Sequence, residues 1–377
     1  MRILWVTNDL PPRPGGIEQF VASLIERVHP ETTLVLGPPA GAEGVSYDRA
    51  QPYSTVRSSR PVMPTPAVRR AVIDLGRLHR PDVVVLGAAW PLGHLARSVS
   101  RALNVPAVAL SHGLEAGMAR TGGGRLIALA SHDLAAMTTI AGWTEDRLRP
   151  HVRAQKFARL APGVDTGRFH PEVEGLGQRR AWGVPDDAPL VGCISRLVPR
   201  KGQDQLLRVW PHVRELHPDA YLALVGEGPA AKQLRSKAAA LGPDAQVVLP
   251  GQVRWGDLPA SFAALDLFAM PCRSRYGGLD IEGLGIVYLE AQASGVPVIA
   301  GDSGGAPEAL QDGVTGTVVG SDRALIDAID GWLRDNEARK VAAKAGRAFA
   351  EAWSWDAIAA KFSDLLEAVV HDANRRR

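Results

Sequence analysis

The chain has 377 residues, of which 46% are hydrophobic and 22% charged, and its formal net charge is +3. This length exceeds one typical hydrophobic core, so we expect two domains. The only cysteines, Cys193 and Cys272, have no zinc-site spacing, which argues against a disulfide framework and a structural metal. The chain opens on a short strand-like run without a secretory leader, and no segment reaches transmembrane length, so we expect a cytoplasmic protein.

Apolar runs rich in Val, Ile and Leu alternate with helical patterns along the first half of the chain. Strands are expected at residues 3–7, 32–36, 82–87 and 105–110, and helices at 17–28, 66–79 and 92–103. Residues 122–151 are expected to be mostly helical, with a short strand near 135–140. Residues 115–124 are rich in glycine and are expected to form a loop.

A polar, irregular stretch at 167–189 is typical of a connection between domains, and the same alternation then restarts. Strands are expected at 190–195, 220–225, 246–249, 267–270, 296–300 and 315–319, and helices at 203–216, 229–241, 257–264, 286–293, 322–353 and 355–370. Continuous apolar strands separated by helices indicate parallel sheets covered on both faces. We therefore predict two doubly wound, Rossmann-like α/β domains facing a cleft, at residues 1–170 and 171–354.

Two carboxylates, Glu282 and Glu290, are separated by seven residues, and Gly283 and Gly285 follow the first of them. The apolar run that comes next reads as the start of a buried helix, directly downstream of a strand. A helix N-terminus preceded by glycines suits a phosphate, and the two glutamates could accept hydrogen bonds from sugar hydroxyls on either side of a diphosphate. The alternative is a solvated acidic loop before an ordinary helix. The glycines and the upstream strand favour the binding site.

Two cations, Arg196 and Lys201, lie in the loop that follows the first strand of the second half. Arginine can hold two phosphate oxygens at once, and lysine acts as a point charge, so together they could neutralise a diphosphate leaving group. A solvated basic loop is the alternative. The position at the carboxyl end of a strand favours a functional role.

Further strand ends carry weaker signals. Gly15 and Gly16 follow the first strand and permit a tight turn near a ligand, although a plain turn explains them equally well. His112 follows the strand at 105–110, where ligand contact and a structural role both stay open. The turn ending at Val253 suits backbone contacts to a base and a ribose, or is a simple turn.

In combination, Gly15–Gly16, residues 195–202, the Glu282/Glu290 pair and Gly304–Gly305 resemble retaining glycosyltransferase family 4, of GT-B fold, over nearly the whole chain. Residues 7–13, 277–291 and 301–308 are similar to the GDP-mannose-dependent phosphatidylinositol monomannoside α-1,6-mannosyltransferases of actinobacteria.

The resemblance implies a role for each matching residue. Glu282 would contact mannose hydroxyls, Glu290 the ribose, and His112 the mannose near the reaction centre, while Asp9 and Gly15 would lie on the acceptor side. The helix at 355–370 would cross back to the first domain. The implied catalytic residues are His112, Arg196, Lys201 and Glu282. The implied donor-binding residues are Gly16, Arg196, Lys201, Val253, Glu282, Gly283, Leu284, Gly285, Ile286, Val287 and Glu290.

The expected partners are a nucleotide-sugar donor and a lipid-linked acceptor, with neither nucleic acid, nor a metal, nor another cofactor. Peripheral contact with an anionic membrane is suggested by a cluster of basic residues with a single intervening acid, Asp74: Arg57, Arg60, Arg69, Arg70, Arg77 and Arg80. The alternative is a surface helix at 66–79 that packs through Val68, Val72, Leu75 and Leu78 and has solvated arginines.

Two other functions stay open. One is a related family 4 transferase that uses another UDP- or GDP-linked sugar on a different lipid or a soluble acceptor. The other is a non-catalytic nucleotide-binding protein of GT-B shape.

Overall fold

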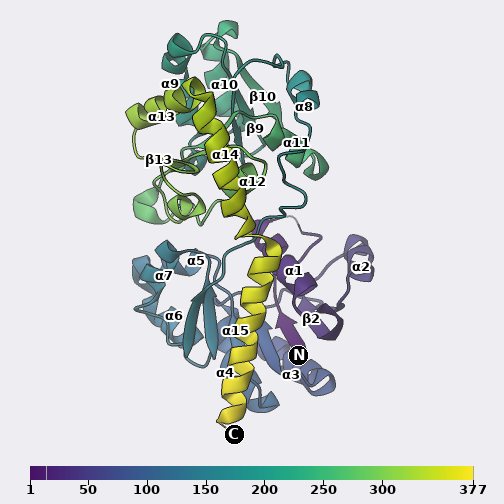
Figure 1. Ribbon diagram of the computed structural model, residues 1–377. Helices are drawn as coiled ribbons and strands as arrows, with labels where there is room; N and C mark the ends of the chain where they lie inside the picture. The colour runs from purple at the N-terminus through teal and green to yellow at the C-terminus, as the bar shows by residue number, and fades with distance from the viewer. Residues whose placement is uncertain (14, 377) are drawn as a thin grey trace. The chain divides into compact units, whose positions relative to one another are not determined.

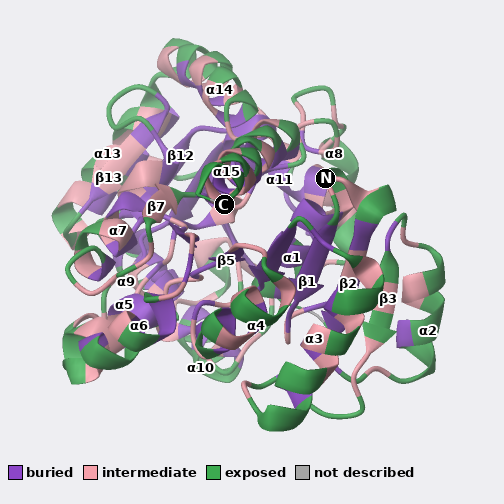
Figure 2. Ribbon diagram, turned by 90° about the horizontal axis from the view of Figure 1, so that it is seen from below, coloured by how far each residue is buried: buried purple, intermediate pink, exposed green. Residues whose placement is uncertain are grey.

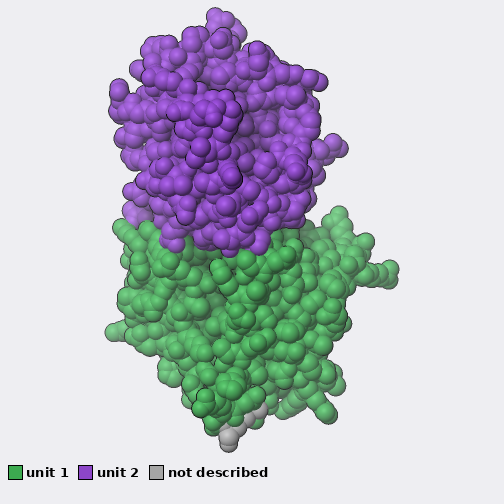
Figure 3. Space-filling model, in the orientation of Figure 1, with its two compact units in different colours: residues 1–163, 355–377 green, residues 164–354 purple. Residues whose placement is uncertain are grey.

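A computed structural model describes residues 1–13 and 15–376 of the chain (Figure 1). The chain divides into two compact units, coloured separately in Figure 3. Unit 1 comprises residues 1–163 and 355–377, and unit 2 comprises Val164–Ser354. Each unit contains its own parallel sheet with helices on both faces, which is the predicted α/β architecture.

The sheet of unit 1 has seven parallel strands in the order β3-β2-β1-β4-β5-β6-β7. The strands are β1 (Ile3–Val6), β2 (Thr33–Gly37), β3 (Ser54–Arg57), β4 (Val83–Leu86), β5 (Ala107–Ala109), β6 (Ala136–Thr139) and β7 (Lys156–Arg159). The helices are α1 (Gly16–Arg27), α2 (Ala42–Arg49), α3 (Pro66–His79), α4 (Ala96–Leu103), α5 (Leu114–Met118), α6 (Gly124–Ser131), α7 (Gly142–Leu148) and α15 (Trp355–Arg375).

Alternation along β1 divides the core of unit 1 into two halves. Ile3 and Trp5 point to one face of the sheet, where α1 and α15 supply the partner side chains. Leu4 and Val6 point to the other face, against side chains of α3, α4 and α6. The centroid of the Phe362 ring in α15 lies 5.7 Å from that of the Trp5 ring. Figure 1 shows α15 running along this unit, and Figure 2 views the same helix nearly along its axis. The predicted return of the C-terminal helix to the first domain is therefore confirmed.

The sheet of unit 2 has six parallel strands in the order β10-β9-β8-β11-β12-β13. The strands are β8 (Leu190–Ile194), β9 (Tyr221–Val225), β10 (Val247–Gly251), β11 (Leu267–Met270), β12 (Val298–Gly301) and β13 (Gly316–Val319). The helices are α8 (Leu176–Ala181), α9 (Gln203–Leu216), α10 (Ala231–Ala240), α11 (Leu258–Ala263), α12 (Ile286–Ala293), α13 (Asp322–Arg334) and α14 (Asn336–Glu351).

The structure also contains elements that the sequence pattern does not reveal. The strands β3 and β7 form the two ends of the first sheet and are only partly buried, so they lack the apolar run of a central strand. The helix α2 is mostly exposed, and α8 lies inside the stretch expected to be irregular.

Two expectations about helices are wrong. The helical pattern at 322–353 is two helices, because the Asp335 side chain accepts a hydrogen bond from the Ala338 N–H at 2.8 Å and thereby starts a second helix. The expected loop at 115–124 is wrong for its first part, which α5 occupies, whereas Thr121 and Gly122 do have non-helical backbone angles and form a kink before α6. Its many glycines obscured the helical pattern.

Candidate functional site

The N-terminus of α12 lies at the carboxyl end of β11, as expected for an anion site in a parallel sheet. Gly285 precedes the helix with φ 85° and ψ 70°, a left-handed conformation, and no side chain caps this end. The first backbone N–H groups, at Ile286 and Val287, therefore lack an intrahelical partner. The buried Tyr288 hydroxyl donates to the Met270 carbonyl at 2.6 Å and fixes the helix against the strand.

The loop after β12 holds the backbone of Glu282 in place. The Gly305 N–H donates to the Glu282 carbonyl at 3.0 Å. Gly304 has φ 60°, and a Cβ atom there would collide with the same carbonyl oxygen. The glycine pair that the sequence singled out thus allows two loops to approach within backbone contact. Gly283 and Leu284 continue this chain segment into α12, and Leu284 is buried.

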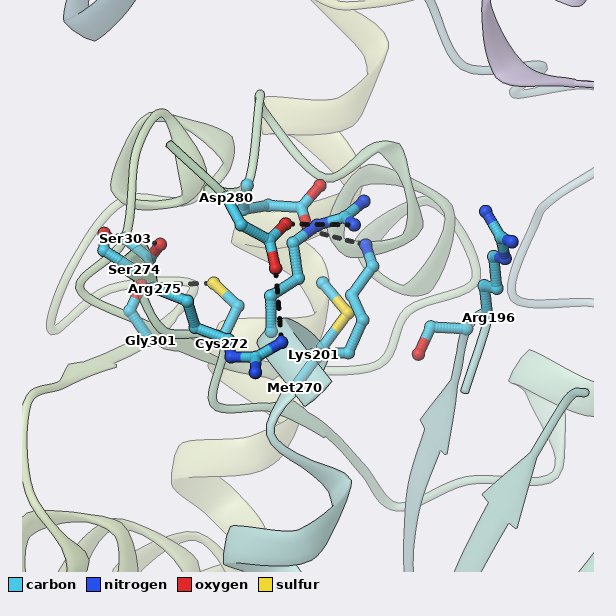
Figure 4. Close-up of polar contacts among 12 residues, drawn as sticks. Arg196, Lys201, Met270, Cys272, Ser274, Arg275, Asp280, Gly301 and Ser303 are labelled. Atoms are coloured by element: carbon cyan, nitrogen blue, oxygen red, sulfur yellow. Dashed lines mark hydrogen bonds and ion pairs between the residues drawn. The ribbon is translucent and has the colours of Figure 1, made fainter. Parts of the chain in front are cut away.

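A buried ion pair joins the two loops of the candidate site. Lys201 Nζ lies 2.6 Å from Glu282 Oε2, and the two residues are only 8% and 6% exposed. Arg200, which the sequence analysis passed over, approaches the same oxygen at 3.7 Å and Asp280 at 3.6 Å. Figure 4 shows Lys201 and Asp280 within this group of polar contacts. The sequence predicted Lys201 and Glu282 as site residues, and the structure places them in direct contact.

Arg196 lies apart from that cluster, although it belongs to the same loop. Its side chain is exposed, and no carboxylate of residues 1–13 and 15–376 lies within 4.0 Å of it. In Figure 4 its guanidinium is well separated from the Lys201 amine. The guanidinium is thus open to an anion that approaches from solvent, while Lys201 already has a partner.

Glu290 is almost completely buried in α12, and burial raises the pKa of its carboxyl to about 7. The positive charge of Arg168 opposes this rise. Arg168 belongs to the stretch that the sequence marked only as a connection, and no local motif singles it out. Its guanidinium lies 4.1 Å from the Trp255 ring centroid and donates to the Trp255 carbonyl.

Val253 lies just beyond β10, two residues before Trp255, and is partly exposed. It is therefore on the same side of unit 2 as the Arg168–Trp255 contact. Trp255 itself is 60% exposed. Arg168 and Trp255 are additional candidates for this part of the site, and only the tertiary contacts reveal them.

In unit 1, His112 follows β5, and its Nε2 lies 2.6 Å from the Gly87 carbonyl oxygen. Because a carbonyl can only accept, Nε2 carries the proton in this contact, and Nδ1 is left for another partner. The ring packs edge-on against Phe20 at 5.6 Å. The loop that carries His112 is held by the buried Glu115, which accepts from the Ser111 hydroxyl at 2.8 Å.

Asp9 and the glycine turn lie at the same edge of this unit. Burial raises the pKa of Asp9, while the charges of His112 and Arg13 oppose the rise, so Asp9 lies within electrostatic reach of His112. Gly16 begins α1, and a side chain at Gly15 would collide with the buried Glu18 carboxylate. Glu18, whose Oε1 lies 2.6 Å from Arg13 Nε, is a further residue that the sequence analysis did not single out.

Metal ligands were not expected from the sequence. Within the described part of the chain, no three His, Cys, Asp or Glu side chains are grouped closely enough to hold a metal ion.

The raised pKa of Glu290 predicts that the free energy of unfolding depends on pH. Between its ordinary pKa of 4.5 and about 7 the folded chain holds a proton that the unfolded chain releases. The free energy of unfolding should therefore fall as pH rises through this range, by on the order of 3 kcal/mol from this group. Glu290→Gln should remove this loss and be more stable than the parent at pH 8, with a smaller difference at pH 5.

Urea denaturation at both pH values measures the effect. Glu337→Gln is the matched control, because the Glu337 side chain is 80% exposed. A stability difference for Glu290→Gln that is the same at pH 5 and pH 8 would contradict the proposed burial effect.

Comparison with known proteins places the chain in a family. Residues 177–349 match the model of the family "Glycosyl transferases group 1". The chain is 38% identical to the GDP-mannose-dependent monoacylated alpha-(1-6)-phosphatidylinositol monomannoside mannosyltransferase of Corynebacterium glutamicum, over 97% of this chain and 98% of that protein. It is 41% identical, with the same coverage of both chains, to the GDP-mannose-dependent alpha-(1-6)-phosphatidylinositol monomannoside mannosyltransferase of Mycolicibacterium smegmatis.

Solved structures confirm the predicted GT-B fold. Anabaena HepE in complex with UDP superposes with a TM-score of 0.81 at 21% identity, covering 98% of this chain and 100% of HepE. Sucrose-phosphate synthase from Thermosynechococcus elongatus superposes with a TM-score of 0.79 at 19% identity, covering 99% and 100%. With full-length relatives at 38% and 41% identity, the chain belongs to the group 1 glycosyltransferase family.

Proposed function

We propose that this protein transfers mannose from GDP-mannose, with retention of the α configuration, to a phosphatidylinositol monomannoside lipid in α-1,6 linkage. The observation that carries the proposal is the pair of relatives named for this donor and acceptor, at 38% and 41% identity over 97% of the chain. The site of unit 2 supports the donor half, because it combines an uncapped helix N-terminus with two loop cations.

The leaving diphosphate would be stabilised by Arg196, Lys201 and the N–H groups at the start of α12. Preorganised donors of this kind stabilise negative charge as it develops in the transition state. Lys201 Nζ forms an ion pair with Glu282 Oε2 at 2.6 Å, and its ammonium group has three N–H donors. The same ammonium group can therefore bind a phosphate oxygen while it orients Glu282 toward the mannose hydroxyls.

Glu290 would hold the ribose. As a carboxylate it only accepts hydrogen bonds, so it suits two vicinal hydroxyl donors. With its pKa near 7, the group is poised between its two forms, and Arg168 favours the charged one.

We infer front-face substitution for the chemical step. The bond from the anomeric carbon to the diphosphate oxygen breaks, and the acceptor hydroxyl forms a bond to that carbon on the same face. The departing phosphate oxygen takes the hydroxyl proton, so the protein need not supply a base. The roles of His112 toward the mannose, and of Asp9 and Gly15 toward the acceptor, remain predictions, as does the cleft between the domains.

The direct test is mass spectrometry of reactions that contain GDP-mannose and a phosphatidylinositol monomannoside. We expect a gain of one hexose, with an α-1,6 linkage in the product. Transfer from UDP-glucose or UDP-N-acetylglucosamine but not from GDP-mannose would favour the first alternative. No turnover with any nucleotide sugar would favour a non-catalytic binding protein.

Calorimetry with GDP and with GDP-mannose should distinguish the roles of Glu282 and Glu290. Glu290→Ala should weaken GDP by about tenfold or more, because a buried partner of the ribose hydroxyls is lost. Glu282→Gln should leave GDP affinity nearly unchanged and weaken GDP-mannose, since its proposed partner is the sugar. Glutamine keeps the volume beside Lys201. Equal losses of GDP affinity in both variants would contradict these assignments.

The two cations should act on the transition state. Arg196→Ala and Lys201→Gln should each lower kcat/KM by about 10²- to 10³-fold, or roughly 3–4 kcal/mol. The double variant should lose less than the sum if both cations bind one diphosphate. Steady-state kinetics with Arg323→Ala as control measures this, since the Arg323 side chain is 83% exposed on α13. If kcat/KM is unchanged in Arg196→Ala, Arg196 does not bind the diphosphate and is only a solvated surface charge.

We also infer peripheral contact of unit 1 with an anionic membrane through α3. Within the described part of the chain, no helix is both long enough and apolar enough to cross a bilayer. Arg60, Arg69, Arg70 and Arg77 are exposed, and each basic residue near an anionic surface adds about 1 kcal/mol of attraction. Arg57 was wrongly included in this cluster, because its guanidinium binds Asp48 and the Pro11 carbonyl.

Co-sedimentation with vesicles that contain phosphatidylinositol tests this contact. Changing Arg60, Arg69, Arg70 and Arg77 together to Ser should release the protein at a lower salt concentration than the parent. The matched control changes four exposed arginines of unit 2, Arg180, Arg235, Arg323 and Arg334, and alters the net charge equally. If both variants lose the same affinity, net charge explains the binding and α3 is not the contact.

A further inference from the structure

A groove of about 1010 Å³ runs along α3 in unit 1. One wall is α3, and the other is formed by the end of β3 and the segment 58–66 that links them. The walls are mainly apolar, with Val56, Met63, Ala71, Leu75 and Leu78 among the lining residues. The first unit thus has a long, mainly apolar hollow, with Asp74 as the acidic residue in its lining, that the donor site does not use.

Large apolar side chains of the groove are unusually accessible. Leu78 is 82% exposed, Met63 42% and Val56 39%. Single exposed apolar residues are common on protein surfaces, but a cluster along one hollow marks a binding surface. The predicted apolar stripe of α3 is therefore divided: Val68 and Val72 are buried against the sheet, whereas Leu78 faces solvent.

One end of the groove is polar and basic. Ser58, Ser59 and Arg60 follow β3 at the carboxyl edge of the sheet, the same edge at which β1 leads to Asp9 and β5 to His112. Arg60 is exposed. A second hollow of about 590 Å³ shares Thr65 and Pro66 with the groove and adds Arg69, Arg97 and Arg101. The charge around this end favours an anionic headgroup beside an apolar chain.

The length of the groove matches a lipid tail. From Pro66 to Leu78 the helix rises about 18 Å, at about 1.5 Å per residue. One leaflet of a bilayer has a hydrocarbon depth of about 15 Å. An extended acyl chain could therefore lie along α3, with its headgroup at the basic end.

We propose that this groove holds one acyl chain of the lipid acceptor, with the lipid phosphate near Arg60. The proposal rests on the proposed function and adds a subsite to it. The chain would enter the apolar hollow while the sugar headgroup lies along the carboxyl edge of the sheet. Acceptor selection would then depend on chain length as well as on the headgroup.

The test compares two synthetic phosphatidylinositol monomannosides, one dihexanoyl and one dipalmitoyl, in the same non-ionic detergent. The parent enzyme should prefer the dipalmitoyl acceptor by about tenfold or more in kcat/KM, since each buried methylene contributes to binding. Ala67→Trp, which fills the groove from an exposed lining position, should remove most of this preference. Met63→Ser combined with Leu78→Ser should do the same by making the walls polar.

In all these variants, the kinetic constants for GDP-mannose and for the dihexanoyl acceptor should remain those of the parent. Leu129→Trp and Leu129→Ser are the controls, because Leu129 is 65% exposed on α6 and does not line the groove. Equal kcat/KM for both acceptors in the parent, or equal losses on both acceptors in the variants, would overturn the subsite.

Two further outcomes are distinguishable. If neither acceptor is mannosylated by the parent, the proposed function itself fails. If the parent is dimeric in sedimentation and the Met63/Leu78 double variant is monomeric, the groove is an interface between two copies, and the lipid subsite is wrong.

Discussion

The candidate donor site depends on one buried ion pair, between Lys201 and Glu282. Removing either charge would leave the other nearly buried without its partner, which is far more costly than losing a surface pair. The pair connects the loop after β8 to the loop before α12, so two separate β–α connections have one fixed arrangement. A ligand that meets both loops meets a preorganised set of charges.

The two loops can adopt this arrangement only because glycines let their backbones pack closely against neighbouring segments. A Cβ atom at Gly202 would collide with the Pro271 carbonyl, and one at Gly304 with the Glu282 carbonyl. Both glycines have positive φ, which other residues adopt at a cost. They bring the loops after β8 and β12 against the segments that follow β11, and so place the ion pair beside the uncapped end of α12.

Burial also determines the character of the second glutamate. Glu290 lies inside α12 with one opposing charge within electrostatic reach, and its pKa near 7 reflects desolvation that Arg168 only partly offsets. A buried carboxylate whose charged form destabilises the folded chain is typical of functional positions. Arg168 also stacks on Trp255, so the linker segment, the loop after β10 and the carboxylate of α12 belong to one local network.

Local sequence patterns were enough to predict the two parallel α/β units, most of the central strands, the start of α12 and the family. Apolar periodicity, strand-end glycines and the spacing of Glu282 and Glu290 are local signals, so they can be recognised without knowing the fold. Edge strands such as β3 escaped detection because an edge need not be apolar on both faces. The pairing of Lys201 with Glu282, the exposure of Arg196 and Leu78, and the binding of Arg57 to Asp48 became visible only in the folded chain. Arg168 and Glu18 also emerged only there. Each of these outcomes depends on contacts between segments distant in sequence, or on the burial that such contacts create, and no local pattern encodes them.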